Sequence, residues 1–417
     1  MLECLVMPYY QRNLIVLAFT VFLAAVSWNQ IMPFLPLFLN EMGVPRSQLF
    51  HWVGIIFSIQ AMASIVAAPF WGKMGDRFGR KPMTIRAGIC LAVIYFTTSI
   101  VRTPLQLVVV RFFNGALTGF IPGSMAIIAT NTPRDKAPKS IAWMQTFIAA
   151  GQIAGPAIGG ILVGMLGFRM SMRVSGIATL FGVLLVVLLV QERNKTELAE
   201  PTSILSDVMV ALRSPVLSSV MLTIMLYGIC VAAILPMLSL HIKSIYPAAS
   251  MKFIGVVFSL PPLALVITAH VWAYVGRRWG YDRGIVTGLI GACTCVLILA
   301  LTRNIWLFVP VFFLMGAFLS GLNTSTPALI ALRVKEHFRG RAYGMELSAS
   351  TLGAFISPLI AGAIATAYGS RSVFLFVAAS YVVGIVLFPM MVRRWHTEPD
   401  DAAIPLTVAE PAESQSN

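Results

Sequence analysis

Residues 72–83 read Gly72-Lys73-Met74-Gly75-Asp76-Arg77-Phe78-Gly79-Arg80-Lys81-Pro82-Met83. Five charged side chains are packed into this short stretch, together with glycines that favour turns. Apolar segments flank it on both sides, at 51–71 and 83–101. Each segment has the roughly 20 residues that a helix needs to cross a bilayer. We therefore expect a tight, charged turn between two membrane helices.

The composition of the chain indicates an integral membrane protein. Of its 417 residues, 58% are hydrophobic and 11% are charged, against roughly 45–50% and about 25% in soluble domains. The net charge is +14, but the basic residues cluster between apolar runs and form no stripe with interleaved aromatics, as nucleic-acid binding would need. We expect lipid to surround the chain and no nucleic acid to bind it.

Twelve apolar runs are long enough to cross a bilayer. Because lipid offers no water to backbone groups, such runs are expected to be helices, which predicts an all-α membrane protein with twelve transmembrane helices. The first run begins with polar residues and lacks a cleavage site, so we interpret it as a retained span. The predicted spans are 14–40, 51–72, 83–102, 104–130, 139–165, 169–191, 216–242, 252–276, 284–302, 304–332, 342–366 and 371–392.

The basic residues predict the orientation of these spans. Of the 30 Lys and Arg residues, the twelve-span reading places 21 on one side of the membrane and 8 on the other, with Arg111 inside it. Since cytoplasmic loops carry the excess of Lys and Arg, we expect both termini in the cytoplasm.

A polar break divides the spans into two similar halves. Residues 192–213 are expected to form a cytoplasmic linker, or a passive tether, between halves at 1–191 and 214–393, with a disordered tail at 394–417. Residues 155–160 are echoed by 357–362 at an offset of 202, and Gly75, Gly79 and Gly115 by Gly276, Gly280 and Gly316 at 201. Two pseudo-symmetric six-helix halves usually indicate a transporter whose substrate lies between the repeats.

The charged loop also resembles the loop between helices two and three of major facilitator superfamily transporters. The resemblance implies that Asp76 contacts the start of helix eleven, near residues 341–346, and closes the cytoplasmic side. From the residues alone, Asp76 should lie where the dipole of the third helix stabilises a carboxylate, and the basic residues could serve orientation only. The predicted gating residues are Gly72, Gly75, Asp76, Arg77, Gly79 and Arg80.

The fifth predicted helix carries small residues at helical spacing. Gly151, Gly155 and Gly159 form a groove for a neighbouring helix, with Gly160 beside them, and Pro156 should bend the helix. This pattern resembles the antiporter motif of the drug:proton antiporter branch of the superfamily. The resemblance implies export and packing against the other half. Helix packing alone is the alternative.

A further motif places an arginine inside the membrane. Leu107-x-x-x-Arg111-x-x-Asn114-Gly115 resembles a family motif whose arginine is associated with proton movement. An arginine deep in an apolar helix costs about 2.5–3.5 kcal/mol on insertion scales, so it should face a wet cavity or a polar partner. A structural arginine bound to backbone carbonyls is the alternative.

Uncharged polar side chains within the runs are candidates for a central cavity, because unpaired amides in lipid are costly. Each could equally form a hydrogen bond between helices. A Pro-x-x-Pro pair near the outer end of the first helix again resembles drug exporters. The cavity candidates are Asn29, Gln30, Pro33, Gln60, Asn114, Gln145, Gln152, Tyr227 and Asn323.

Proton coupling needs a group that titrates, yet no acid falls near the middle of any predicted span. Glu346 lies in the first turns of one span, and we predict that Glu346, Asp76 and Arg111 couple transport to protons. His241, near the outer end of the seventh span, is expected to be solvated. Without a buried acid, the cavity suits neutral or anionic substrates better than cations.

Taken together, these features predict a secondary transporter in the bacterial cytoplasmic (inner) membrane, acting as a monomer. Neither a nucleophile triad, a phosphate-binding loop nor metal-ligand spacing is recognisable, so we expect no enzyme, cofactor or metal. The resemblance implies proton-coupled efflux of drugs or toxic amphipathic metabolites. A narrow-specificity sugar or metabolite exporter, an uptake symporter and a membrane sensor are the alternatives. The likeness covers most of the chain and is densest at 12–16, 32–37 and 69–72.

Overall fold

The computed structural model describes residues 7–117, 119–193, 209 and 214–395, and every long regular element in this part of the chain is a helix. The predicted linker and tail lie mostly outside the described residues. The helices are α2 (Tyr9–Asn29), α3 (Leu35–Glu41), α4 (Arg46–Phe78), α5 (Arg80–Ile100), α6 (Pro104–Leu117), α7 (Phe120–Asn131), α8 (Ala137–Leu189), α10 (Pro215–Ile245), α11 (Met251–Trp279), α12 (Tyr281–Leu301), α13 (Ile305–Arg333), α14 (Glu336–Tyr368) and α15 (Arg371–Trp395).

The prediction of twelve crossings is confirmed. The described chain contains 11 candidate spans that are long and apolar enough to cross a membrane. One of them, α8, has 53 residues, so it would extend about 80 Å as a single straight helix, far more than one crossing needs. Gly167 leaves the helical conformation with φ 76° and ψ 167° and divides α8 into two crossings.

Two predicted spans are interrupted rather than continuous. The first ends as α2 at Asn29, and α3 begins only at Leu35. Pro33 has no N–H to continue the helix, and the N–H groups of Phe34 and Leu35 both turn back to the Ile31 carbonyl at 3.1 Å. The fourth span divides into α6 and α7, and α7 follows Gly119, whose φ of +136° favours glycine. The prediction of single helices over 14–40 and 104–130 was therefore wrong.

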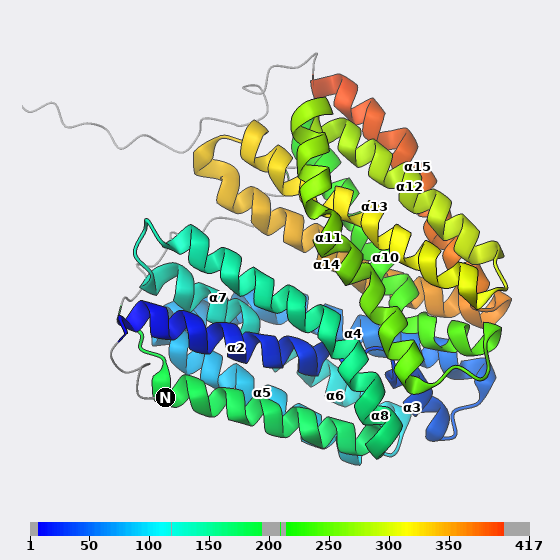
Figure 1. Ribbon diagram of the computed structural model, residues 1–417, viewed down its shortest axis with the longest axis horizontal. Coiled ribbons are helices and arrows are strands. Elements are labelled where there is room, and N and C mark those ends of the chain that lie inside the picture. Colours follow the sequence, from blue (N-terminus) through cyan, green and yellow to red (C-terminus); the bar gives the residue numbers. More distant parts are fainter. Residues whose placement is uncertain (1–6, 118, 194–208, 210–213, 396–417) are drawn as a thin grey trace, which may run out of the picture.

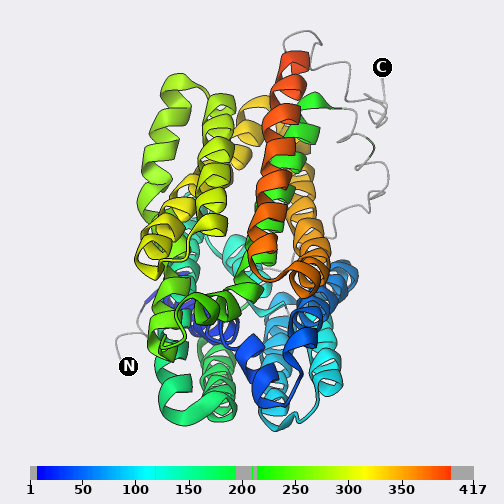
Figure 2. The same cartoon turned by 90° about the vertical axis from the view of Figure 1, so that its right-hand side faces the viewer.

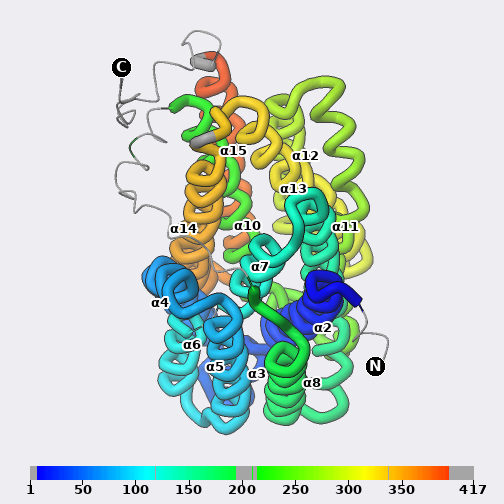
Figure 3. Tube along the Cα trace, turned by 90° about the vertical axis from the view of Figure 1, so that its left-hand side faces the viewer, coloured from blue at the N-terminus to red at the C-terminus, as the bar shows by residue number. Residues whose placement is uncertain are grey.

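The helices form two bundles, α2–α8 and α10–α15, which converge at one end and diverge at the other (Figure 1). We call the end that carries α3, seen in Figure 2, the closed end. The opposite end, where α4 gives way to α5, is the open end, seen in Figure 3. The first helix begins and the last helix ends at the open end, as an even number of crossings requires.

Glycines bring the two bundles together at the closed end. A Cβ atom on Gly54 of α4 would lie 2.5 Å from the Pro358 carbonyl oxygen of α14. Gly255 of α11 packs in the same way against the carbonyl of Pro156 in α8. Gly54 and Gly255 are related by the offset of 201 and the two prolines by 202. The α4–α14 and α8–α11 contacts are therefore pseudo-symmetric copies of one another. No side chain fits in either crossing, which allows close backbone contact.

Hydrogen bonds repeat the same symmetry inside each bundle. The indole Nε1 of Trp71 donates to the Ala116 carbonyl at 2.6 Å, and that of Trp272 donates to the Ala317 carbonyl at 2.7 Å. The glycine that begins the following helix, Gly79 or Gly280, has φ 97° in both halves. The predicted pseudo-symmetric six-helix halves are therefore confirmed by packing, hydrogen bonding and backbone conformation.

Candidate functional site

A cavity of about 690 Å³ lies within the first bundle, among α2, α4, α5, α6, α7 and α8. This volume is within the range of about 300–1,000 Å³ typical of small-molecule sites. Alanines, glycines and the rings of Trp28 and Trp71 form much of its wall. Asp76 and Arg80, at the junction of α4 and α5, bring opposite charges to the wall near the open end.

The cavity gathers residues from two predicted groups, the cavity candidates and the gating residues. Two of the cavity candidates, Asn29 on α2 and Gln152 on α8, line the cavity. The Asn29 Nδ2 atom donates to the Ala25 carbonyl at 2.8 Å, one turn back in its own helix. From the loop, the structure brings Gly72, Gly75, Asp76 and Arg80 to the same cavity.

The charged loop is held within its own bundle. An oxygen of the Asp76 carboxylate pairs with the Arg80 guanidinium at 3.3 Å, and Arg80 also donates to the Ala126 carbonyl at 3.0 Å. The Arg77 guanidinium instead lies over the Phe78 ring, 5.3 Å from its centroid. The contact between Asp76 and residues 341–346 stays a prediction.

Glu192 caps the start of α5, a contact that the sequence analysis missed. Its two carboxylate oxygens accept the backbone N–H groups of Arg80 and Lys81 at 2.8 and 2.9 Å. These are the first free donors of α5, where a carboxylate is stabilised by hydrogen bonds and by the helix dipole. We expected Asp76 to have this role, but Asp76 lies in the last turn of α4. A lone glutamate 112 residues away gives no sequence signal for the contact.

Arg111 is buried in the first bundle and does not line the cavity. Only 4% of Arg111 is exposed, and its Nη1 atom donates to the Gln60 amide oxygen at 3.0 Å. Gln60 and Asn114 are also buried, and the Asn114 Oδ1 atom has no hydrogen-bond partner in the described chain. These two candidates therefore lie between helices rather than in the cavity wall.

Gln30 and Pro33 also have positions different from those expected. The Gln30 Nε2 atom contacts the Ser175 hydroxyl and the Ser171 carbonyl, so it links the end of α2 to the second part of α8. Pro33 is buried in the turn before α3. Both residues lie in the segment between α2 and α3, where the first span is interrupted, and neither lines the cavity.

The glycines of α8 contact two different partners. Gly151, Gly155 and Gly159 pack against the backbone of α2, within the same bundle. Pro156 and Gly160 face α11 of the second bundle. The implied packing against the other half therefore applies to Pro156 and Gly160, whereas the three glycines at four-residue spacing hold the first bundle together.

The remaining candidates do not line this cavity. Gln145 and Asn323 are exposed, and Tyr227 is half-buried against the core of the second bundle. Glu346 lies on α14 in the second bundle and is half-buried. The three predicted coupling residues are thus distributed over both bundles.

His241 is buried rather than solvated. Its Nδ1 atom lies 2.8 Å from the Ser370 hydroxyl, and its ring contacts Phe308 and Phe374. The expectation of a solvated histidine was wrong because α13, α15 and the turn between α14 and α15 cover the His241 ring.

Two pseudo-symmetric helical bundles, one of which encloses a largely apolar cavity with a few charged residues, are the architecture of a membrane transporter rather than of an enzyme. The chain belongs to the Major Facilitator Superfamily, whose family model matches residues 17–248 and 220–413. The protein is therefore an integral membrane protein that carries small molecules.

Relatives and solved structures are similar over nearly the whole chain. The "Multidrug resistance protein MdtG" of Proteus mirabilis is 30% identical over 391 residues, which cover 93% of this chain and 96% of the relative. The protein of the same name from Salmonella typhimurium is 28% identical, covering 91% and 94%. A bacterial homologue of the human lysosomal transporter Spinster, in an inward-facing and occupied conformation, shares the fold with a TM-score of 0.79 at 11% identity, covering 93% of this chain and 97% of that one. The nucleoside transporter NupG has a TM-score of 0.75 at 16% identity, covering 93% and 100%.

Proposed function

We propose that this protein exports drugs or toxic amphipathic metabolites in exchange for protons, by alternating access across the bacterial cytoplasmic membrane. The observation that carries the proposal is the cavity beside Asp76, near the open end, in a molecule whose bundles meet through glycines at the opposite end. This arrangement suits a site that is loaded from one side and released to the other when the bundles rock.

Two observations support export: the distribution of basic residues and the similarity to multidrug resistance proteins. The charged loop lies at the open end, and its excess of basic residues favours the cytoplasm, with both termini on the same side. A cavity near that end would collect substrate from the cytoplasm. The relatives named for multidrug resistance favour export of drugs over export of one sugar or metabolite.

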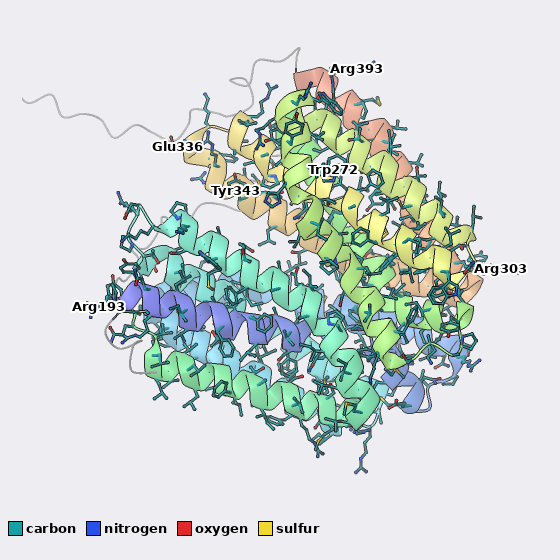
Figure 4. All side chains as sticks on the ribbon, in the orientation of Figure 1. Arg193, Trp272, Arg303, Glu336, Tyr343 and Arg393 are labelled. Atoms are coloured by element: carbon teal, nitrogen blue, oxygen red, sulfur yellow. The ribbon has the colours of Figure 1, made fainter. Side chains whose placement is uncertain are left out.

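The proposed cycle exchanges partners at the open end. Asp76 leaves Arg80 and approaches the start of α14, near residues 341–346, as the bundles close around the substrate. Figure 4 places Glu336 and Tyr343 of α14 on the arm of the second bundle that stands away from the first. Glu346 is proposed to gain and lose the proton, while Arg111 and Asp76 transmit its charge state. The halves 1–191 and 214–393 move as units joined by 192–213, in a monomer.

Inverted membrane vesicles test the proposal directly. With a proton gradient that is acid inside, an added drug should make the lumen more alkaline as protons leave in exchange. Uptake by symport would instead acidify the lumen, and a sensor would leave its pH unchanged. A response to one metabolite but to no drug would favour the narrow exporter. Vesicles that lack the protein provide the baseline.

A further inference from the structure

A shallow groove runs along the first three turns of α5, at the surface of the first bundle (Figure 3). Its lining residues all belong to α5, and Arg86 alone is shared with the cavity described above. Because Ile89 is 45% exposed and does not line that cavity, the groove opens toward the lipid around the bundle. The lining residues are Lys81, Pro82, Ile85, Arg86, Ile89 and Cys90.

The groove carries two positive charges near its start. The Lys81 Nζ atom donates to the Val187 carbonyl of α8 at 3.0 Å, and since an ammonium has three donors, two remain for another acceptor. The Arg86 guanidinium is stacked on the Trp71 ring, 3.3 Å from its centroid. Its Nε and Nη1 atoms are buried, so Arg86 supplies a fixed charge rather than these two hydrogen bonds. Neither side chain forms an ion pair within the described residues.

A carboxylate near Lys81 does not cancel these charges by direct pairing. The Glu192 oxygens accept the backbone N–H groups of Arg80 and Lys81, where the dipole of α5 also stabilises them. The Lys81 ammonium is therefore left to an acceptor from outside the described chain, apart from its bond to Val187.

The groove also has the length and polarity gradient of half a bilayer. From Lys81 to Cys90 the helix rises about 14 Å, which is nearly half of a hydrocarbon core roughly 30 Å thick. The charges lie in the first two turns, at the open end of the bundle, and the lining beyond them is apolar. A phosphate at the start of the groove would therefore continue into an acyl chain along Ile85 and Ile89.

We propose that this groove binds an anionic phospholipid. Lys81 donates to the phosphate, Arg86 attracts it through its charge, and one acyl chain packs on Ile85 and Ile89. Basic residues at the membrane surface attract anionic lipids in this way. The inference goes beyond the proposed function, because the ligand is a lipid of the membrane and not the cargo, and it holds whichever way the protein transports.

The second bundle contains a copy of this face without its charge. At the internal offset of 201, Lys81 corresponds to Asp282 and Arg86 to Thr287, and the neighbouring Arg283 balances Asp282. The apolar residues Ile85 and Ile89 correspond to Val286 and Ile290, which are also apolar. Packing against lipid therefore explains the apolar residues in both copies, but it does not explain why only the first copy is cationic.

Two lipids that differ only in headgroup test the proposal. Native mass spectrometry of the purified full-length protein would measure the affinity of the tightest-bound lipid for dioleoyl phosphatidylglycerol and for dioleoyl phosphatidylcholine. We expect the anionic lipid to bind about tenfold more tightly, because two basic side chains attract it. Equal affinities would overturn the proposal. Glycerol 3-phosphate has no acyl chain and should not compete; competition by it would assign the groove to free phosphates instead and also overturn the proposal.

A lysine variant assigns the headgroup preference to the groove. Lys81→Gln should reduce the preference for phosphatidylglycerol to about twofold, because one of the two charges is lost. Lys139→Gln removes the same charge from an exposed position at the start of α8, outside the groove, and should keep the full preference. Arg86 is left in place, so its stacking on Trp71 is undisturbed. An unchanged preference in Lys81→Gln would contradict the proposal.

A pair of tryptophan variants tests the acyl-chain part without changing any charge. Ile89→Trp fills the groove and should weaken phosphatidylglycerol binding by at least about fivefold. Val93→Trp, one turn further along α5, enlarges a side chain that is 56% exposed but outside the groove, and should bind as the wild type does. Equal binding by the two variants would show that the lipid does not occupy the groove and would overturn the proposal.

Discussion

Three arginines of the first bundle show how one side chain type serves different purposes. Arg80 is neutralised by Asp76, Arg111 donates to the neutral amide of Gln60, and Arg86 lies on an aromatic ring. A buried charge without a counter-charge is costly and rarely present without a function. Arg86 and Arg111 have no carboxylate partner among the described residues, so we expect their charges to have a role in transport.

Replacing Asp76 tests the exchange of partners at the open end. Asp76→Asn removes the charge that holds Arg80 and that would dock on α14, so drug export in inverted vesicles should fall by at least about tenfold, since charge-assisted bonds are roughly twice as strong as neutral ones. The amount of protein in the membrane should not change. Asp135→Asn, in the exposed loop before α8, is the control. Full export by Asp76→Asn would exclude a gating role.

Replacing Glu346 tests proton coupling. Glu346→Gln keeps the size of the side chain but cannot titrate. We expect the drug-induced change in lumen pH to disappear, while the affinity for the drug stays within about twofold, because the cavity lies in the other bundle. Glu336→Gln, exposed at the start of α14, should behave as the wild type does. Unaltered coupling in Glu346→Gln would rule the residue out.

At the level of elements, capping and glycine contacts decide where helices begin and cross. Glu192→Ala removes the acceptor of two backbone N–H groups at the start of α5. Loss of a helix cap typically costs about 1 kcal/mol, so the thermal midpoint of the purified protein should fall by a few degrees. Glu41, exposed at the end of α3, does not cap the start of a helix, so Glu41→Ala should leave the midpoint unchanged. Equal midpoints for both variants would contradict the assigned role.

The glycines of α8 offer a test one helical turn apart. A Cβ at Gly160 would lie 2.6 Å from the Met251 carbonyl oxygen of α11, whereas one at Gly164 would make an ordinary contact at 3.7 Å with the Met251 Cβ. Gly160→Ala should force the bundles apart at the closed end and lower export several-fold. Gly164→Ala should export at the wild-type rate. If both variants exported equally well, close packing of α8 on α11 would not matter for transport.

The sequence predicted those structural features that are determined by neighbouring residues in the chain. Long apolar runs identified the crossings. Charge with glycine identified the turn between the second and third crossings, but its predicted extent of 72–83 was wrong, because α4 continues to Phe78 and α5 begins at Arg80. The breaks at Pro33 and Gly119 were missed because hydrophobicity continues through them. Contacts between distant segments were missed for another reason: nothing near Gln30 in the chain indicates Ser175, and nothing near Arg80 indicates Glu192.

At the level of the whole molecule, the duplicated fold carries an unequal distribution of charge. Both halves keep the glycine crossings and the Trp–carbonyl hydrogen bonds. Asp76 and Arg111 of the first half correspond to Arg277 and Phe312 in the second. The symmetric contacts can serve the rocking motion, because the α4–α14 and α8–α11 contacts at the closed end are equivalent and can separate together. Asp76 and Arg111 act from the first bundle alone, because the second bundle has no equivalent of either.

The central claim is that the closed end must open in each cycle, and a disulfide across it is the most direct test. The Met251 Cβ lies 3.7 Å from the position of a Cβ on Gly164, close to the separation that a disulfide needs. Gly164→Cys and Met251→Cys would be combined after the native cysteines are replaced by serine, with each single variant as a control. Oxidation should lower drug export by at least about tenfold in the double variant alone, and reduction should restore it. Full export by the oxidised, cross-linked protein would contradict the account.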